Sequence, residues 1–381
     1  MDNKYKVWVE IDSDAVKNNL RFFRSRLGDN CQLFAVVKSN AYGHGLIDFS
    51  KLVANEVDGF CVDSVMEGLA LRREGINKPI LVLGSTLPHL LLKAAENNIT
   101  ITVSNFDALN AVLNSHSDPG LGIGGRILFH LKLDTGMHRQ GFYLNDLERV
   151  IQEFRISNFE FRNQLKGLCT HFASAKDVNY PTYTERQFEE FLRGVKVLEG
   201  AGFNNLIKHV AATGGTLISN KYHLDAVRLG IGLYGMWPSK ELEIQRDGVL
   251  EPVLSWHTIV SEVKEVKVGD YIGYDLTERM AKDGKIAILP IGYWHGLPRS
   301  LSNGVGEVLI NNQRARVLGR VSMDMIVVDV SNIACQYGDR VTIIGRQGDG
   351  RISAEDVARR MGTINYEVVT GINPLIKRIV K

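Results

Sequence analysis

Short apolar runs alternate with longer amphipathic stretches between about residues 30 and 235. The runs have strand length and are rich in β-branched residues, which is typical of buried parallel strands. Eight of them lie at residues 33–38, 59–63, 80–84, 101–104, 127–134, 166–172, 207–212 and 226–233. Helical spacing of apolar positions marks residues 64–75, 88–98, 105–114 and 184–201. We expect Ser64 and Ser104 to be helix N-caps and Pro88 to occupy a first helical turn.

This alternation predicts an α/β fold. Eight strands separated by helices favour a closed (β/α)₈ barrel of the TIM type. An open, doubly wound sheet is the alternative, but no GxGxxG sequence follows the first strand, as such a sheet would favour for a dinucleotide.

From about residue 240 the pattern changes to β-type runs separated by Gly, Asn and Asp turns, which predicts a mostly β second domain. The runs are residues 253–267, 270–274, 285–290, 306–311, 314–321, 325–330 and 340–345. One helix near 353–361 is expected to begin at a capping sequence, Ser353 to Asp356. We therefore expect domains at residues 1–240 and 241–381, with a first strand at about 6–12 that joins the second domain.

Composition excludes several classes of function. The formal net charge of the 381 residues is +2, so the sequence predicts no nucleic-acid surface. No apolar stretch is long enough to span a bilayer, and the first residues lack the apolar segment of a signal peptide, so we expect a cytoplasmic protein. Four dispersed cysteines predict free thiols, mostly buried, and the histidines lack the spacing of metal ligands.

Lys38 is the first candidate for chemistry. It follows the apolar run Leu33–Val37 and opens the glycine-containing segment SNAYGHG. An amine placed there can sit in an apolar pocket, as Schiff-base chemistry with an aldehyde cofactor requires. The alternative is a lysine at a strand end whose ammonium group extends to water.

Polar residues also follow later strands of the predicted barrel, whose carboxyl ends carry function in TIM-type barrels. Arg139 follows the fifth strand, His171 ends the sixth, and Arg228 lies in the eighth. Thr213-Gly214-Gly215 follows the seventh, where backbone N–H groups and a hydroxyl can hold a phosphate. Taken alone, this segment is equally a flexible turn.

Nearly the whole chain resembles the alanine racemase family. The matching motifs are AVVKSNAYGHG (35–45), KLDTGMHRQG (132–141), THFASA (170–175), VRLGIGLYG (227–235), IGY (272–274), PIGYWHGLPR (290–299), GRVSMD (319–324) and GTINYEV (362–368). The resemblance implies a barrel that binds pyridoxal 5′-phosphate (PLP), followed by a β domain. It also implies interconversion of L- and D-alanine, which would supply D-alanine for peptidoglycan synthesis.

The resemblance further implies site residues. Lys38 would carry PLP as a Schiff base, and Lys38 and Tyr274 would be the two bases on opposite faces of the substrate. The implied cofactor-binding residues are Lys38, Tyr42, Thr213, Arg228, Gly230, Ile231 and Tyr366. His171 and Arg228 would connect the Tyr274 phenol to the cofactor ring. Because an arginine keeps its proton, Arg228 favours racemisation over decarboxylation.

Substrate and access residues follow from the same resemblance. Those implied to contact the substrate are Arg139, Met323, Asp324 and Lys132, and those lining the access path are Tyr293, Arg299 and Arg320. Lys132 matches a position that carries a carbamate in some members, but a plain strand lysine is an equal alternative. Tyr274 could likewise be an amphipathic tyrosine at a strand end. The implied assembly is a homodimer in which the second domain of one subunit completes the other's site.

Several positions depart from the family pattern. Trp294 and His295 stand where Ala-Asp is common, Lys176 replaces an acid near the access path, Thr213 replaces serine, and Thr370 stands where cysteine is frequent. These departures leave substrate preference open. A racemase for serine or for several amino acids is therefore an alternative, and a PLP-dependent decarboxylase or a non-catalytic PLP carrier is a more distant one.

Overall fold

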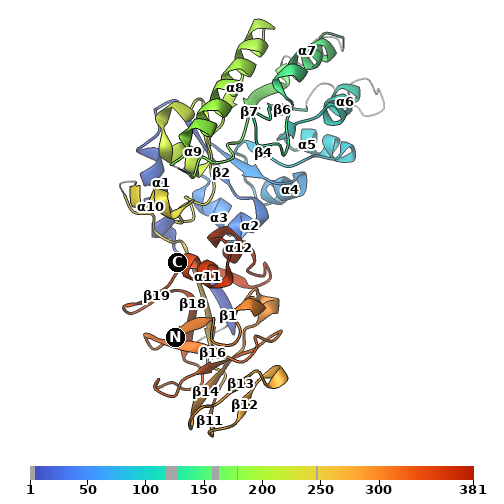
Figure 1. Cartoon of the computed structure of the whole chain (residues 1–381). Coiled ribbons are helices and arrows are strands. Elements are labelled where there is room, and N and C mark those ends of the chain that lie inside the picture. Colours follow the sequence, from blue (N-terminus) through green and yellow to red (C-terminus); the bar gives the residue numbers. More distant parts are fainter. Residues whose placement is uncertain (1–4, 116–126, 157–162, 178, 246–247) are drawn as a thin grey trace. The chain divides into compact units, whose positions relative to one another are not determined.

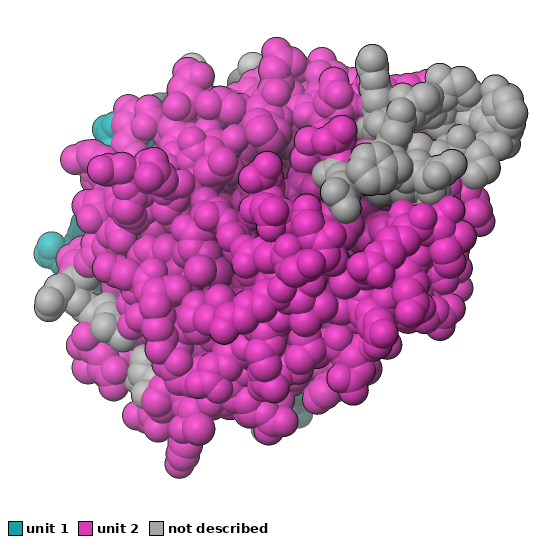
Figure 2. Space-filling model, turned by 90° about the horizontal axis from the view of Figure 1, so that it is seen from above, with its two compact units in different colours: residues 1–15, 42–48, 252–381 teal, residues 16–41, 49–251 magenta. Residues whose placement is uncertain are grey.

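The computed structural model describes residues 5–115, 127–156, 163–177, 179–245 and 248–381 (Figure 1). The first four residues, which contribute to the expected absence of a leader, lie outside this range. The chain forms two compact units, coloured separately in Figure 2. Unit 1 contains Met1–Ala15, Tyr42–Asp48 and Pro252–Lys381, and unit 2 contains Val16–Ala41 and Phe49–Glu251.

Unit 2 is built on a sheet of eight parallel strands. These are β2 (Gln32–Val36), β3 (Gly59–Val62), β4 (Ile80–Val82), β5 (Ile99–Val103), β6 (Phe129–Lys132), β7 (Leu165–Cys169), β8 (Ile207–His209) and β9 (Ala226–Leu229). Their order is β8-β7-β6-β5-β4-β3-β2-β9. Arg228 N–H donates to the carbonyl of Ala211 at 2.9 Å, and Ala212 forms a parallel bridge with Arg228, so β8 also meets β9. The predicted barrel is confirmed, and the open sheet is wrong.

Helices connect or follow the strands of this barrel (Figure 1). They are α1 (Ser13–Arg24), α3 (Leu46–Val53), α4 (Val65–Arg73), α5 (Leu91–Glu96), α6 (Phe106–Asn114), α7 (Leu147–Ile156), α8 (Pro181–Gly200), α9 (Thr213–Ile218) and α10 (Lys240–Gln245). Ser64 caps α4 as predicted, and Pro88 opens a 3₁₀ turn before α5. The predicted cap Ser104 is wrong, because the extended residue Asn105 accepts the N–H of Ala108 at 2.8 Å instead.

Unit 1 is a mostly antiparallel sheet, ordered β11-β14-β17-β16-β15-β18-β10-β1-β20, with β19 paired to β18. The strands are β1 (Val7–Ile11), β10 (Leu254–Ile259), β11 (Glu262–Val266), β14 (Gly284–Leu289), β15 (Glu307–Ile310), β16 (Gln313–Leu318), β17 (Ile326–Asp329), β18 (Arg340–Gln347), β19 (Gly350–Ile352) and β20 (Lys377–Val380). A separate pair is β12 (Tyr271–Ile272) with β13 (Glu278–Arg279). β1 lies between β10, to which it is antiparallel, and β20, to which it is parallel.

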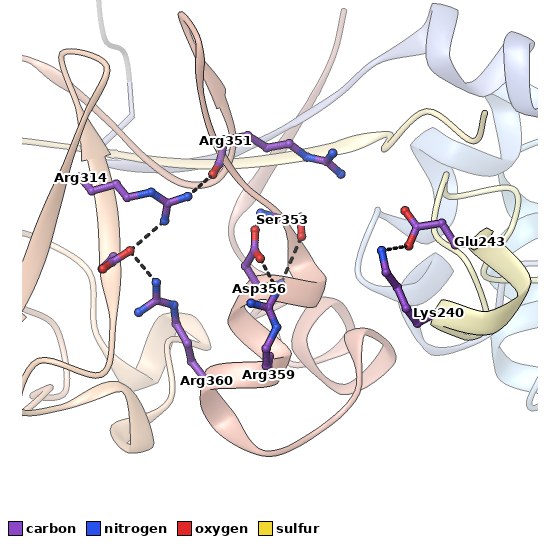
Figure 3. Close-up of polar contacts among 9 residues, drawn as sticks. Lys240, Glu243, Arg314, Arg351, Ser353, Asp356, Arg359 and Arg360 are labelled. Carbon is purple, nitrogen blue, oxygen red and sulfur yellow. Dashed lines mark hydrogen bonds and ion pairs between the residues drawn. The ribbon is translucent and has the colours of Figure 1, made fainter.

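Two features of unit 1 differ from the sequence prediction. The single run 253–267 is two strands, because the chain changes partners at Val260 and Ser261: β10 pairs with β18, whereas β11 pairs with β14. Two α-helices, rather than one, lie among the described residues from Pro252 onward. The predicted helix is α11 (Ala354–Met361), whose cap is a reciprocal box between Ser353 and Asp356 (Figure 3). The second is α12 (Asn365–Thr370), too short to give a periodic signal.

Other expectations concern the chain as a whole. All four cysteines are free, and Cys31, Cys61 and Cys169 are buried, as predicted. Among the described residues, no helix combines the length and apolar character that crossing a bilayer requires.

Candidate active site

Lys38 begins a left-handed turn instead of ending a strand. β2 ends at Val36, and α2 (Lys38–Tyr42) follows. The φ angles of Ser39, Asn40, Ala41 and Tyr42 are 55°, 56°, 51° and 52°. This conformation costs a non-glycine residue about 1–2 kcal/mol. Such strain persists only where neighbouring contacts fix it, and it clusters at functional sites.

A carboxylate from α4 fixes this turn. Glu67 Oε1 accepts the N–H of Ser39 at 2.8 Å, and Glu67 Oε2 accepts the N–H of Asp63 at 2.7 Å. Asp63 in turn forms an ion pair with Lys38, with Oδ1 and Nζ 3.2 Å apart. The Lys38 side chain is 36% exposed, so the expected apolar pocket around its amine is wrong. The amine instead faces a carboxylate at the open end of the barrel strands.

Arg228 lies inside the barrel without a carboxylate partner among the described residues. It is 4% exposed, and its Nη atoms donate to main-chain oxygens. Nη1 donates to the carbonyl of His209 at 2.9 Å, and Nη2 donates to those of Thr170 and Val210 at 2.8 and 3.1 Å. No described residue accepts from Nε–H. The guanidinium is therefore fixed by its two Nη groups, and one donor remains for a ligand.

His171 lies two residues beyond β7, with Nδ1 3.5 Å from Arg228 Nη2. Burial, and then the nearby charge of Arg228, lower the pKa of His171 to about 3. The ring is thus neutral at physiological pH. Because arginine only donates, Nδ1 accepts and Nε2 carries the proton. His171 accordingly presents an N–H that has no acceptor among the described residues.

The loop after β6 carries Arg139 and is folded around Asp134. Oδ1 of Asp134 accepts the N–H groups of Gly136 and His138 at 3.0 and 2.9 Å, and Oδ2 accepts that of Arg139 at 3.0 Å. Burial alone would raise the pKa of Asp134, but these three hydrogen bonds lower it below its usual value. The Arg139 side chain is exposed and forms no ion pair with a described residue. Its guanidinium is available to a carboxylate.

Lys132 is buried in β6, and burial lowers the pKa of its amine. Its Nζ donates to Oε1 of Gln140 at 3.1 Å, so its partner is this amide and not Arg139. A small hollow lies here, lined by Lys132, Leu133, Asp134, Met137, Arg139, Gln140, Thr170 and His171. The structure thus brings three of the predicted residues, Lys132, Arg139 and His171, to one hollow.

Gln187 of α8 joins the loops that carry Arg139 and His171. It is fully buried; its Oε1 accepts the N–H of Ala173 at 2.8 Å, and its Nε2 donates to the carbonyl of His171 at 3.2 Å and to Thr135 Oγ1 at 3.5 Å. Gln187 was not among the predicted residues: helical spacing places it on the buried face of α8, four residues before Phe191, but does not show which loops its amide contacts.

Thr213 connects the loops after β8 and β9. Its buried Oγ1 accepts the N–H groups of Gly230 and Gly232 at 3.2 and 3.3 Å. A Cβ on Gly232 would lie 2.4 Å from the ring of Phe23 and 2.7 Å from Thr213 Cγ2, so this approach requires glycine. The hydroxyl, the Gly230–Ile231 backbone and the first turn of α9 together provide polar groups suited to a phosphate.

In unit 1, Tyr42 packs against Tyr366 of α12, with ring centroids 6.0 Å apart. Burial raises the pKa of Tyr366, and Tyr42 raises it further, so its hydroxyl remains a donor. The next residue, Gly43, accepts at its carbonyl from Nε and Nη2 of Arg378 at 3.1 and 2.8 Å. A Cβ on Gly43 would lie 1.9 Å from the carbonyl oxygen of Val369. Tyr42 is therefore anchored to α12 and β20.

Tyr274 follows β12 in a short 3₁₀ turn and is 65% exposed. The adjacent Asp275 has φ 61°, and its Oδ2 lies 2.9 Å from Arg320 Nε and 3.9 Å from Arg299 Nη2. Two of the residues assigned to the access path therefore contact the carboxylate next to Tyr274 in the chain.

The loops with Tyr293 and Met323 are joined through their backbones. Tyr293 N–H donates to Ser322 O, and Trp294 N–H donates to Met323 O, both at 3.0 Å. A Cβ on Gly292 would lie 2.2 Å from Ser322 O. Tyr293 is 43% exposed, Trp294 48% and Met323 52%, so an aromatic and thioether surface adjoins Asp324. His295 turns inward and accepts the N–H of Gly292 at Nδ1, 3.1 Å away.

The predicted residues thus form two sets. Unit 2 brings together Lys38, Lys132, Arg139, His171, Thr213, Arg228, Gly230 and Ile231 at the carboxyl ends of barrel strands. Unit 1 carries Tyr42, Tyr274, Tyr293, Arg299, Arg320, Met323, Asp324 and Tyr366. Within the described residues, no group of His, Cys, Asp and Glu side chains is arranged for a metal ion.

Known proteins match this architecture along its full length. Residues 11–238 match the alanine racemase N-terminal domain, and residues 253–380 match the alanine racemase C-terminal domain. The chain is 38% identical over 379 residues to an alanine racemase of Methanococcus maripaludis, covering 98% of both chains. It is 35% identical over 390 residues to that of Leptospira interrogans, covering 100% of this chain and 97% of the relative.

Solved structures agree with these sequence matches. The alanine racemase from Bacillus anthracis with bound L-Ala-P has a TM-score of 0.92 at 35% identity, covering 100% of this chain and 96% of that one. The Clostridium difficile enzyme in complex with cycloserine has a TM-score of 0.88 at 30% identity, covering 99% and 96%. The chain therefore belongs to the alanine racemase family of isomerases.

Proposed function

We propose that this protein interconverts L-alanine and D-alanine with PLP as its cofactor. The observation that carries the proposal is Arg228, a buried guanidinium fixed by main-chain oxygens with Nε–H left over. A donor that cannot lose its proton suits a neutral ring nitrogen and keeps that nitrogen unprotonated. A carboxylate at this position, suited to decarboxylation, is absent from the described residues around Arg228.

The residues present fit PLP. Lys38 provides an amine for the aldehyde, and Thr213 with the Gly230–Ile231 backbone provides polar groups for the phosphate. Tyr42 and Tyr366 are the further phosphate contacts that we assign from the family. When bound, PLP stabilises negative charge that develops on the substrate α-carbon.

The charges around the hollow favour an anionic substrate. Arg139 lines it, and Arg228 places a second positive charge beside His171, while the carboxylate of Asp134 is already bound by three main-chain N–H groups. We assign Arg139 to the substrate carboxylate, because a guanidinium binds such a group through two parallel hydrogen bonds. Lys132 would orient this region through Gln140, whether or not its amine carries a carbamate.

Racemisation requires removal of the α-proton on one face and delivery on the other. We assign these roles to Lys38 and to Tyr274 from a second copy of the chain. His171, with its fixed Nε2–H, would orient the phenol, and Met323 and Asp324 would contact the substrate. Tyr293, Arg299 and Arg320 would line the access path. The proposal therefore includes a homodimer with shared sites.

Three further expectations belong to the proposal. The domain boundary near residue 240 is supported by the start of unit 1's continuous part at Pro252 and by the pairing of β1 with β10 and β20. A cytoplasmic location and the supply of D-alanine for peptidoglycan follow from the family resemblance alone.

A racemase for serine or for several amino acids is the second candidate. Trp294 and His295 favour it, because they change the surface beside Tyr293 from the usual Ala-Asp pair. Such a change would act on substrate access rather than on the chemistry.

An absorbance spectrum and a racemisation assay test the proposal. The purified dimer should show the visible band of lysine-bound PLP and should lose it on borohydride reduction. It should bring pure L-alanine and pure D-alanine to zero optical rotation, and faster than L-serine or L-lysine. Bound PLP without loss of rotation would indicate a carrier, evolved CO₂ would indicate a decarboxylase, and either result would contradict the proposal.

A further inference from the structure

Two buried histidines beneath Arg228 have no role in the chemistry proposed above. His130 of β6 and His209 of β8 lie in the barrel interior, with 4% and 0% of their surface exposed. His130 Nδ1 is 2.7 Å from His209 Nε2, and the ring centroids are 4.9 Å apart. The other nitrogen of His209, Nδ1, faces Nη1 of Arg228 within hydrogen-bonding distance.

The direction of each hydrogen bond follows from the arginine. A guanidinium only donates, so Nδ1 of His209 must accept, and the proton of this neutral ring lies on Nε2. That N–H donates to Nδ1 of His130, which places the His130 proton on its own Nε2. Burial, and then the charge of Arg228, lower the pKa of His130 to about 3, which agrees with one proton on the ring at physiological pH. The chain Arg228–His209–His130 thus has one proton arrangement.

The barrel leaves space for this arrangement at Gly167. Gly167 of β7 is the register partner of His130, and a Cβ there would lie 2.6 Å from both Nδ1 and Cε1 of the His130 ring. A Cβ–ring distance this short does not occur without a shift of one group. The missing side chain at 167 therefore permits the ring position that faces His209.

We propose that His130 is a positioning residue: by accepting from His209 Nε2–H it selects the His209 tautomer that accepts from Arg228, and so fixes the guanidinium that faces the cofactor. The part that concerns PLP rests on the proposed function, whereas the proton arrangement does not. Without an acceptor at position 130, the buried Nε2–H of His209 is unsatisfied. The free energy then favours a turned His209 ring or its other tautomer. In either case Nη1 of Arg228 loses its ring acceptor.

Neutron diffraction from crystals of the deuterium-exchanged holoenzyme tests the proton arrangement. We expect deuterium on Nε2 of His130 and of His209 and none on either Nδ1. Deuterium on Nδ1 of either ring would overturn the proposal, whether or not PLP is bound.

Variants of His130 test the consequence for Arg228. His130→Asn keeps an acceptor close to the position of Nδ1, whereas His130→Leu has a similar volume and no acceptor. The leucine variant should shift the absorbance band of bound PLP, change its pH dependence, and lower kcat about tenfold or more. The asparagine variant should keep the wild-type band and most of kcat. Thr102→Val is the control, because Thr102 is a buried interior hydroxyl that donates to Val82 O at 2.6 Å.

Gly167→Ala keeps the His130 side chain but displaces its ring, because the new Cβ would lie 2.6 Å from Nδ1 and Cε1 of that ring and 2.8 Å from the carbonyl oxygen of Ile207 in β8, which carries His209. It tests the His130–His209 contact if His130→Leu does not fold. It should reproduce the spectral shift of the leucine variant. If His130→Leu or Gly167→Ala keeps the wild-type PLP band and pH profile, and only unfolds at a lower temperature as Thr102→Val does, the proposal is overturned. If the wild-type protein binds no PLP, the proposed function fails, and the neutron result alone decides the role of His130.

Discussion

The carboxylate of Glu67 accepts the main-chain N–H of Ser39 at 2.8 Å, and this contact fixes the first left-handed residue after Lys38. The same carboxylate accepts the N–H of Asp63, the ion-pair partner of Lys38. One side chain in the first turn of α4 therefore sets both the backbone that carries the lysine and the charge that faces its amine.

Glu67→Gln should destabilise the protein by about 1–2 kcal/mol, because an amide offers one acceptor where two N–H groups need acceptors. The Nε2 donor of the glutamine would then face one of the two main-chain N–H groups, of Ser39 or Asp63, which would be left without an acceptor. Urea unfolding with an unchanged m-value measures the loss, and PLP retention on dialysis should fall with it. Glu74→Gln is the matched control: its exposed pair with Lys51 is worth at most about 1 kcal/mol. Equal midpoints for both variants would show that Glu67 does not fix the turn.

Lys38→Ala should lose the visible band of lysine-bound PLP and racemisation in both directions, because residues 38–45 after β2 contain no other lysine. Lys51→Ala is the control, since Lys51 lies on the exposed side of α3 and pairs only with Glu74 among the described residues. Lys51→Ala should keep the visible PLP band and the wild-type racemisation rates. If Lys38→Ala keeps activity and a visible band that borohydride abolishes, the Schiff base belongs to another lysine.

Much of the fold follows from hydrophobic patterning, and its limits have physical causes. Each of the eight barrel runs overlaps one strand, with ends that differ by up to four residues. Ser104 and Asn105 are both good capping residues, so composition does not distinguish them; the extended backbone of Asn105 does. The left-handed turn after Lys38 depends on Glu67, a contact between elements that no local propensity encodes.

The candidate site could also be predicted only in part from the sequence. Lys38, Arg139, His171 and Arg228 were expected at one end of the barrel because they follow or end strands. Their partners His209 and Gln187 were missed, since a buried histidine or glutamine looks like any other polar residue in sequence. One signal existed: His130 and Lys132 are two residues apart in β6, so they share the face of the strand that points inward.

Acid stability should depend on Glu10 in β1. Lys381 Nζ, Trp8 Nε1 and Arg340 Nη2 lie 2.6, 3.0 and 2.9 Å from its carboxylate. Burial alone would raise the pKa of Glu10, but the hydrogen bonds from Lys381 and Trp8 and the charges of His257 and Arg340 lower it to about 2. A carboxyl whose pKa falls on folding stabilises the protein above its unfolded value, 4.5, and this stability is lost as the pH falls toward about 2.

Glu10→Gln should therefore be less stable than wild type at pH 7 by up to about 3 kcal/mol. The difference should shrink below pH 4.5 and vanish near pH 2. Burial, and then Arg340, lower the pKa of His257 to about 3, so both proteins lose stability in acid and the difference between their curves is the informative quantity. Urea midpoints at a series of pH values measure it. A difference that stays constant down to pH 2 would contradict the role of Glu10.

Tyr274→Phe should keep the PLP band, because Lys38 remains, but should slow proton transfer on one face by about a hundredfold or more. Deuterium incorporation from D₂O, followed by NMR, separates the faces: one enantiomer should still exchange its α-proton while conversion to the other nearly stops. Tyr271→Phe is the control, since Tyr271 is 51% exposed on β12 and lies three residues away in the same unit. Its rates should match wild type. If Tyr274→Phe converts both enantiomers at the wild-type rate, the phenol is not the second base, and the pairing of a lysine from one subunit with a tyrosine from the other must be abandoned.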